Sequence, residues 1–302
     1  MYVFRIHIRP QGGTATPKDS FEYCLRNSIL GVGWQINSTK TPESWEAYLK
    51  EAEQIHRNVQ GPKYIKRWVS PGDLVWTRDH EGNYYLAQVK SGWEYWMGPE
   101  AIEKDIDIAN IFRVALYPVS LDAVPGNIVA CFRPKRTIQE ITNERAVEYT
   151  KYLWNKVSGI DAYKIDSDLT SDIFEFLDDE ETEDVVFLYM QHQGWFIVPN
   201  SRKVDSMSYE FYATNPKTGE RAVAQVKTGN VQLDRDLYAQ VRERVILFQS
   251  RENYTGNDYD KITCLSRHEL LNFMSDSYSW LPVALQRKLD ICRTLAQGRS
   301  PA

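Results

Sequence analysis

The residues best suited to chemistry lie in one short stretch, between positions 209 and 227. Two runs rich in β-forming residues, Tyr209–Thr214 and Ala222–Lys227, flank an Asn-Pro-Lys-Thr-Gly turn, and this pattern predicts a β-hairpin. Side chains alternate between the two faces of a strand, so Gln225 and Lys227 should point the same way. Glu210 is expected in the middle of the opposite strand. A carboxylate, an amide oxygen and a lysine on one face of a hairpin could hold a divalent cation beside a water.

These residue types suit the hydrolysis of a phosphodiester. That reaction needs a hard cation, which neutralises the scissile phosphate and lowers the pKa of a bound water. Mg²⁺ prefers oxygen ligands and takes one or two carboxylates while it keeps several waters. Mg²⁺, or Mn²⁺ in its place, is therefore the expected cofactor. Glu210 or Asp205 would be the main carboxylate ligand, Gln225 would give a neutral oxygen, and Lys227 would orient the attacking water or stabilise the transition state.

The elements around the hairpin are expected to position these side chains. A helix should begin in the acidic run that contains Glu183 and Asp184, and it should end at Gly194. Either acid could reach the site from this helix, although acids there also simply favour a helix N-terminus. Ser266 and Glu269 form a capping-box start for a later helix. The expected order is helix, strand, hairpin, helix, strand, strand and helix, over residues 181–194, 195–199, 209–227, 234–240, 241–248, 261–265 and 266–274.

This order resembles the restriction-endonuclease-like (PD-(D/E)XK) fold, and most closely its Mrr-like members, over residues 170–280. The residues that carry the resemblance are the acidic helix ending in Gln193-Gly194-Trp195, the Lys203–Glu210 segment, and Gln225-Val226-Lys227-Thr228-Gly229. The resemblance implies a mixed sheet flanked by helices and a metal-dependent nuclease site. It also implies a Gln at position 225, where the general motif has an acid.

The resemblance bears on the choice between the two candidate metal ligands. In the Mrr-like pattern two aspartates lie four residues apart, and the second is the ligand. In this chain Glu210 occupies the position of the second aspartate. It is a glutamate rather than an aspartate, and the gap from Asp205 is one residue longer than in the pattern. Glu210 is favoured, and Asp205 stays open.

Residues 1–136 are expected to form a separate domain, made of short strands joined by tight turns. Strands are expected at Met1–Arg9, Ile29–Ile36, Leu74–Arg78, Tyr84–Val89, Ala109–Val119 and Asn127–Phe132. Thr41 as N-cap and Pro42 at the first helical position predict a helix that runs to Val59. Closely spaced strands of this kind favour a small β-barrel. A helical linker over residues 137–168 should lead to the second domain, residues 169–302.

The first domain resembles the PUA superfamily, and most closely its EVE branch. The resemblance rests on Gly33-Trp34, on Pro71–Val75 feeding a hairpin, on the run from Trp93 to Trp96, and on Val124-Pro125-Gly126. It implies the binding of RNA or of a modified DNA base in an aromatic pocket, where stacking and edge hydrogen bonds hold a flipped base. The candidate residues are Trp34, Asn37, Trp76, Trp93 and Trp96, with core packing as the alternative role of each tryptophan.

Composition limits the remaining classes of protein. The chain has 302 residues and a net charge of −5, which counts weakly against a nucleic-acid binder. No apolar run approaches the length of a membrane span, and the N-terminus lacks a signal-peptide pattern, so a cytoplasmic protein is expected. No CxxC, His/Cys cluster or glycine-rich phosphate loop occurs, which argues against structural zinc and NTP hydrolysis.

Together these patterns favour a Mg²⁺-dependent DNA endonuclease, whose first domain selects a target, plausibly a modified base, and whose second domain cuts. This layout fits modification-dependent restriction or phage defence. One alternative is a binding module whose nuclease fold has lost activity, since Gln225 leaves one less charge for a metal. Another is an RNA-directed enzyme. Cutting both strands usually needs two sites, so a homodimer is expected by analogy.

Overall fold

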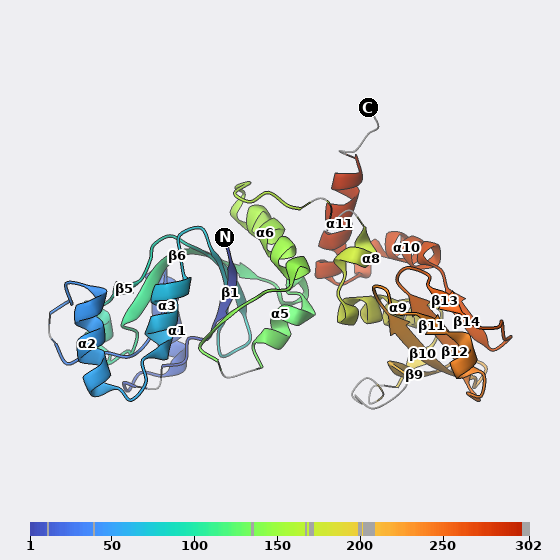
Figure 1. The fold of residues 1–302 in the computed structure, drawn as a ribbon, viewed down its shortest axis with the longest axis horizontal. Coiled ribbons are helices and arrows are strands. Elements are labelled where there is room, and N and C mark those ends of the chain that lie inside the picture. The colour runs from blue at the N-terminus through green and yellow to red at the C-terminus, as the bar shows by residue number, and fades with distance from the viewer. Residues whose placement is uncertain are drawn as a thin grey trace. The chain divides into compact units, whose positions relative to one another are not determined.

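The chain forms two compact units, Met1–Ile165 and Asp166–Ala302 (Figure 1). The computed structural model describes residues 1–10, 12–38, 40–133, 136–166, 168, 172–198, 201 and 209–297, with side chains to position 294. Each unit combines helices with its own sheet and its own core.

The first unit is built on a seven-stranded sheet in the order β2-β6-β4-β3-β1-β7, with β5 paired to β6. Strand β6 pairs with β4 over one half of its length and with β2 over the other, so the sheet curls into a half-barrel. The two end strands, β2 and β7, do not pair with each other in the described part of the chain, so the small β-barrel that was expected is a half-barrel there. The strands are β1 Val3–Ile6, β2 Ile29–Val32, β3 Leu74–Arg78, β4 Tyr84–Val89, β5 Glu94–Tyr95, β6 Asn110–Val119 and β7 Ile138–Glu140.

Helices cover the first sheet and close its core. The core packs aliphatic residues of β1, β2, β4 and β6 against Phe21 of α1 and Ile65 of α3. A smaller cluster around Tyr48 and Ala52 joins α2 to this sheet. The helices are α1 Pro17–Arg26, α2 Trp45–Ile55, α3 Gln60–Trp68, α4 Pro99–Glu103, the 3₁₀ helix η1 Leu121–Ala123, α5 Gly126–Cys131 and α6 Glu144–Ser158.

Two elements of this unit differ from the sequence expectation. The helix expected from Thr41 begins at Trp45, because the side chain of Ser44 caps the amide of Ala47 at 3.1 Å, and it ends at Ile55 rather than Val59. The strand expected at Asn127–Phe132 is helix α5. Ile128 of α5 and Phe132, which caps its C-terminal end, are both buried and lie four positions apart, which is the period of a helix and not of a strand.

The segment expected to be a helical linker packs into the first unit. Its first residues form β7, which pairs antiparallel with β1. Helix α6 then contacts the core, since Trp76 Nε1 donates to Thr150 Oγ1 at 3.1 Å and the Tyr149 hydroxyl donates to the carbonyl of Ala123 at 2.9 Å. These buried contacts extend the first unit to Ile165.

The second unit is built on a five-stranded mixed sheet in the order β14-β12-β10-β9-β8. Strands β8, β9 and β10 form an antiparallel meander, and β10, β12 and β14 run parallel. The predicted hairpin is therefore confirmed as β9–β10. The strands are β8 Phe196–Ile197, β9 Phe211–Thr214, β10 Arg221–Lys227, β12 Arg244–Gln249 and β14 Ile262–Leu265, with a separate pair formed by β11 Leu233–Asp234 and β13 Tyr254–Thr255.

Two helices of the second unit form where the sequence predicts them, α9 from two residues earlier than expected, whereas α8 and α11 were not predicted and the helix expected over residues 234–240 is the 3₁₀ helix η3. Helix α9 begins with a capping box between Asp178 and Glu181, and Gly194 takes a positive φ of 86° just after its end. Helix α10 has the predicted capping box of Ser266 and Glu269. The helices are α8 Ile173–Phe176, α9 Asp179–His192, η3 Arg235–Tyr238, α10 Arg267–Asp276, η4 Tyr278–Trp280 and α11 Val283–Gln297.

The fold is thus a mixed α and β structure in both units. In the part of the chain that is described, no helix is both long enough and apolar enough to cross a membrane.

Candidate functional site

Three of the predicted site residues converge at the open end of the β9–β10 hairpin. The Oε1 atom of Glu210 accepts hydrogen bonds from Gln225 Nε2 at 2.5 Å and from Lys227 Nζ at 2.9 Å. Gln225 is buried, and the side chains of Glu210 and Lys227 are 22% and 38% exposed. The site therefore has a buried floor and an opening to solvent.

The sheet positions these side chains. Strand β10 lies between β9 and β12, and its residues from Ala222 to Val226 are buried. Glu210 directly precedes β9, not in mid-strand as expected, and its amide donates to the carbonyl of Ala224 at 2.9 Å. Gln225 and Lys227 lie two residues apart on β10 and face Glu210 together, as the alternation of a strand requires.

The donor atoms suit a hard cation. Glu210 Oε2 has no hydrogen bond among the described residues, and the Gln225 amide also carries an oxygen. The described residues contain no group of three or more His, Cys, Asp or Glu that could hold a metal. Mg²⁺ takes as few as one carboxylate when waters complete its shell. The residues therefore fit Mg²⁺ in donor type, with Glu210 as the charged ligand.

The other acids predicted for the site are Asp205, Glu183 and Asp184. Asp205 lies outside the described residues. Glu183 and Asp184 lie in the second turn of α9, and the acid that contacts the end of β10 is Asp179, whose Oδ1 accepts from the hydroxyl of Thr228. At about 100° per residue, Glu183 lies about 40° around the helix from Asp179, and Asp184 about 140°. Glu183 is thus nearer to Asp179 around the helix than Asp184 is, and no contact of either acid with Glu210, Gln225 or Lys227 is seen among the described residues.

Sequence reasoning missed Asp179 and also Gln249, the last residue of β12. Gln249 is fully buried, and its register partner on β10 is Lys227. Its amide donates to the carbonyl of Gly229 at 2.8 Å and accepts from the amides of Arg251 and Asn253 at 2.7 and 2.9 Å. Gln249 thus fixes the loops that follow both strands, and a polar residue at the end of a buried strand is the signal that could have found it.

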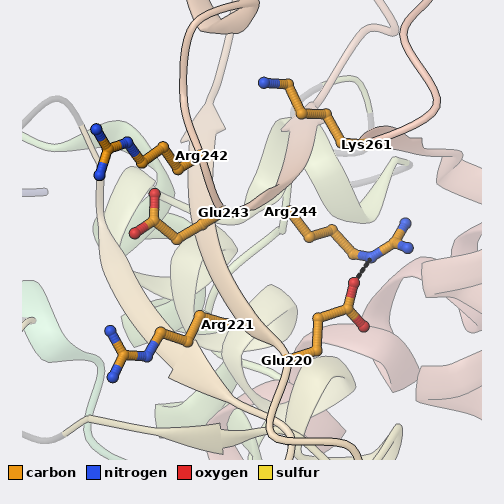
Figure 2. Close-up of a pocket in the computed structure, with 6 residues that line it drawn as sticks. All are labelled: Glu220, Arg221, Arg242, Glu243, Arg244 and Lys261. Atoms are coloured by element: carbon orange, nitrogen blue, oxygen red, sulfur yellow. Dashed lines mark hydrogen bonds and ion pairs between the residues drawn. The ribbon is translucent and has the colours of Figure 1, made fainter.

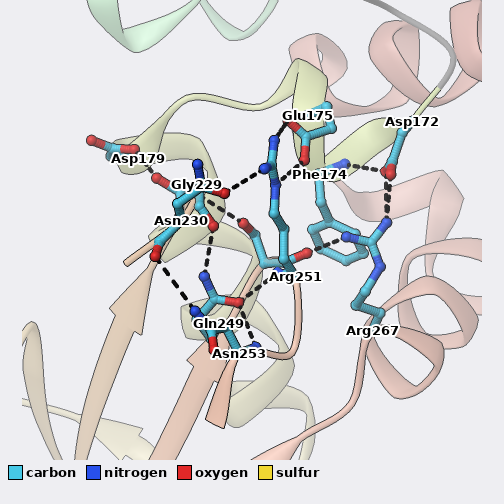
Figure 3. A network of polar contacts seen from close by, with 12 residues as sticks. Asp172, Phe174, Glu175, Asp179, Gly229, Asn230, Gln249, Arg251, Asn253 and Arg267 are labelled. Atoms are coloured by element: carbon cyan, nitrogen blue, oxygen red, sulfur yellow. Dashed lines mark hydrogen bonds and ion pairs between the residues drawn. The ribbon is translucent and has the colours of Figure 1, made fainter. Parts of the chain in front are cut away.

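Around this glutamine, ion pairs tie the loops to α8 and the residues before it (Figure 3). Arg251 donates from Nε and Nη2 to the two carboxylate oxygens of Glu175, at 2.7 and 2.9 Å. Arg267 binds both oxygens of Asp172 at 2.8 and 2.7 Å, and its guanidinium lies 4.7 Å from the centre of the Phe174 ring. These ion pairs stabilise the loops. Because Arg251 and Arg267 are neutralised by carboxylates outside the site, the positively charged side chain that contacts Glu210 is that of Lys227.

An aromatic residue also lies beside the site. The ring of Tyr238 in η3 is 6.3 Å from that of Tyr209. Burial, followed by the charges of Tyr209 and Glu210, raises the pKa of the Tyr238 hydroxyl. Tyr238 therefore stays protonated near the carboxylate and is able to donate a hydrogen bond.

In the first unit, Trp34 has the most unusual geometry of the predicted base-binding residues. Its backbone φ is 62°, a left-handed conformation that is rare for a bulky residue and is a feature of functional sites. Its Nε1 donates to the carbonyl of Asn58 at 2.5 Å, and a pocket of about 600 Å³ is lined by Asn58 and by the neighbouring residues of α2 and α3. The indole of Trp34 thus contacts a residue that lines this cavity.

The remaining candidates divide between core and surface. Trp76 is fully buried, so its ring is a core element that no base reaches in this conformation. Trp93 and Trp96 are partly buried, and their indole nitrogens donate to Asn110 at 2.9 Å and to Tyr23 at 2.6 Å. Asn37 is exposed near Trp34. Trp34, Asn37, Trp93 and Trp96 are therefore the candidates that retain an accessible surface.

Comparison with protein-family models gives no match to this chain, and comparison with curated proteins gives none either.

Proposed function

We propose that the chain is a Mg²⁺-dependent endonuclease that hydrolyses phosphodiester bonds in DNA. The observation that carries the proposal is the convergence of Glu210, Gln225 and Lys227 at one end of the hairpin. The element order of the second unit supports it, because α9, β8, the β9–β10 hairpin, β12, β14 and α10 follow in the expected order, with the short 3₁₀ helix η3 where a helix over residues 234–240 was expected.

The reaction needs a water oxygen to bond to phosphorus while one P–O ester bond breaks and a proton passes to the leaving oxygen. A bound Mg²⁺, held by Glu210 and the Gln225 amide oxygen, would supply charge neutralisation and a more acidic water. Lys227 holds its ammonium beside Glu210 and is partly exposed, so it can donate to the attacking water or to a phosphate oxygen.

The first unit would select the target, and a modified base is the proposed ligand. Trp34 supports this assignment through its positive φ and its hydrogen bond to Asn58, a residue that lines a cavity. Modification-dependent restriction or phage defence is the biological role that such a pairing of units would serve.

The test is cleavage of duplex DNA by the purified chain with Mg²⁺ and with its Lys227→Ala variant. Loss of the ammonium should lower the rate by about 100-fold or more, the usual effect of removing a transition-state donor. Lys217→Ala is the matched control, because Lys217 is exposed in the turn of the same hairpin. Cleavage by Lys227→Ala at the wild-type rate would end the assignment.

A second candidate is a nucleic-acid-binding module with a nuclease fold that no longer cuts. It is favoured by the single described carboxylate at the site, and by Gln225 and Lys227 both donating to the same oxygen of Glu210. Calorimetric titration with Mg²⁺ and Mn²⁺ separates the two candidates. Metal binding that disappears in Glu210→Ala supports the enzyme, and no metal binding, even with DNA present, supports the module.

A further inference from the structure

The second unit has a basic pocket at the end of the sheet opposite to Lys227. Its cavity of about 380 Å³ is lined by Glu220, Arg221, Arg242, Glu243, Arg244 and Lys261. Arg221 begins β10, Arg244 begins β12 and Lys261 precedes β14, and these three strands run parallel. Their N-terminal ends therefore meet at one edge. Arg221 and Lys227 are six positions apart on β10, which places the pocket about 20 Å from the candidate active site.

The cations of this pocket outnumber its acids by four to two, in a chain whose net charge is −5. Both acids already have partners: Glu220 binds Arg244 at 2.8 Å (Figure 2). Glu243 accepts from the Tyr212 hydroxyl at 3.0 Å. Among the described residues, Lys261 donates only to the backbone carbonyl of Val241. The pocket therefore carries positive charge that its own carboxylates do not neutralise.

Arg242 is a cation of this pocket that no described carboxylate neutralises. Its side chain is exposed and has no hydrogen bond or ion pair with any described residue, and Arg221 has no carboxylate partner there. Elsewhere in the unit, Arg235, Arg251 and Arg267 each bind a carboxylate. Arginines that stay unpaired beside a cavity provide planar donors suited to the oxygens of a phosphate.

We infer that this pocket binds phosphate groups of a nucleic-acid strand, as a contact separate from the hairpin site. Neighbouring strands lie about 4.8 Å apart, so the cations of β10, β12 and β14 spread over about 10 Å. This spread exceeds one phosphate group and fits successive phosphates of a backbone. The contact is independent of sequence, and it adds affinity without touching a base.

The test measures binding of a fluorescent DNA oligonucleotide to the full chain by anisotropy, in a chelator so that cleavage plays no part. Arg242→Ala should weaken binding by about tenfold, because a charge-assisted hydrogen bond to phosphate is lost. The slope of log affinity against log salt should fall by about 1. Arg293→Ala is the matched control: Arg293 is also an exposed arginine, on α11, and its removal should leave both quantities unchanged.

A second titration, with inorganic phosphate and with a mononucleotide, identifies the source of the phosphate. Loss of phosphate or mononucleotide binding in Arg242→Ala, with oligonucleotide binding unchanged, would show a site for small phosphate compounds and overturn the proposal. Equal oligonucleotide affinity and salt slope in Arg242→Ala and the wild type would overturn it as well. Because no cleavage is read, a weakened Arg242→Ala would stand even if the hairpin site proved inactive.

Discussion

The ammonium of Lys227 lies 2.9 Å from Oε1 of Glu210, across the open end of a hairpin whose turn is at the other end. Both side chains are partly exposed, at 38% and 22%. An ion pair of this exposure contributes only about 0–1 kcal/mol to stability. Substitutions of Lys227 should therefore leave the fold in place, and their effects on activity can be interpreted as effects on the site.

Gln225→Glu should make the stability of the second unit depend on Mg²⁺. The new carboxylate would lie against Glu210, where Gln225 Nε2 now donates at 2.5 Å, and two adjacent carboxylates repel each other. Without metal we expect a loss of about 1–3 kcal/mol in the free energy of unfolding, since a buried hydrogen bond is also lost. Added Mg²⁺ should restore the melting temperature.

Thermal unfolding with and without Mg²⁺ checks this expectation, and Gln232→Glu is the control because Gln232 is exposed outside the site. If the melting temperature of Gln225→Glu does not respond to Mg²⁺, the carboxylates do not share a cation.

The chain's sequence predicts the hairpin well, because the alternation of β10 alone places Gln225 and Lys227 on one face. It also predicts α10, whose capping box is a local signal, and α9 from two residues after its observed start. The contact of Asp179 with Thr228 could not be predicted in this way. It joins the start of a helix to a loop 49 residues away, and no local sequence pattern indicates such a contact. Helix α5 was missed because a short apolar run fits either a strand or a helix.

Burial of the tryptophans was equally hard to predict. Trp76 is fully buried, and its indole nitrogen donates to Thr150 of α6. From the sequence, α6 was expected to belong to a linker and not to cover this strand. Trp93 and Trp96, from the same aromatic-rich domain, stay partly exposed. The difference depends on which helix covers which part of the sheet, and this is a tertiary property.

Gly61→Ala should destabilise the first unit, although alanine normally favours a helix over glycine. A Cβ at position 61 would lie 2.7 Å from Cη2 and Cζ3 of Trp34, so the indole must move. We expect a loss of about 1–3 kcal/mol, as for other overpacked sites, against a gain of about 1 kcal/mol if the space were free. Gly92→Ala is the control, because its Cβ would meet nothing within 4 Å.

Denaturant unfolding followed by tryptophan fluorescence measures this change. A Gly61→Ala protein as stable as Gly92→Ala would show that the Trp34 ring is not held against α3.

Asp178→Asn should stabilise the second unit at neutral pH and have little effect in acid. Burial, and then the charge of Glu181, raise the pKa of Asp178 from 3.8 to about 6, while Lys288 opposes the shift. The native carboxyl thus keeps its proton longer than the unfolded one, so its ionisation costs stability as the pH rises from about 4 to about 6. Asparagine keeps the side-chain oxygen that caps the Glu181 amide at 2.8 Å, and it carries no charge.

The gain from Asp178→Asn should reach about 1–3 kcal/mol above pH 6 and vanish near pH 4, as two pKa units imply. Unfolding measured across this pH range is the test, with Glu180→Gln as an exposed control on the same helix turn. A gain that is constant with pH would contradict the assignment.

The central claim is that Glu210 is the charged ligand of a phosphodiester-cleaving site. The most direct measurement is the Mg²⁺-dependent rate of duplex DNA cleavage by Glu210→Gln compared with the wild type. The substitution keeps the shape of the side chain and removes its charge, so we expect wild-type cleavage that requires Mg²⁺ and a variant slower by about 100-fold or more. Equal rates in the two proteins, or wild-type cleavage that persists in a chelator, would contradict the claim.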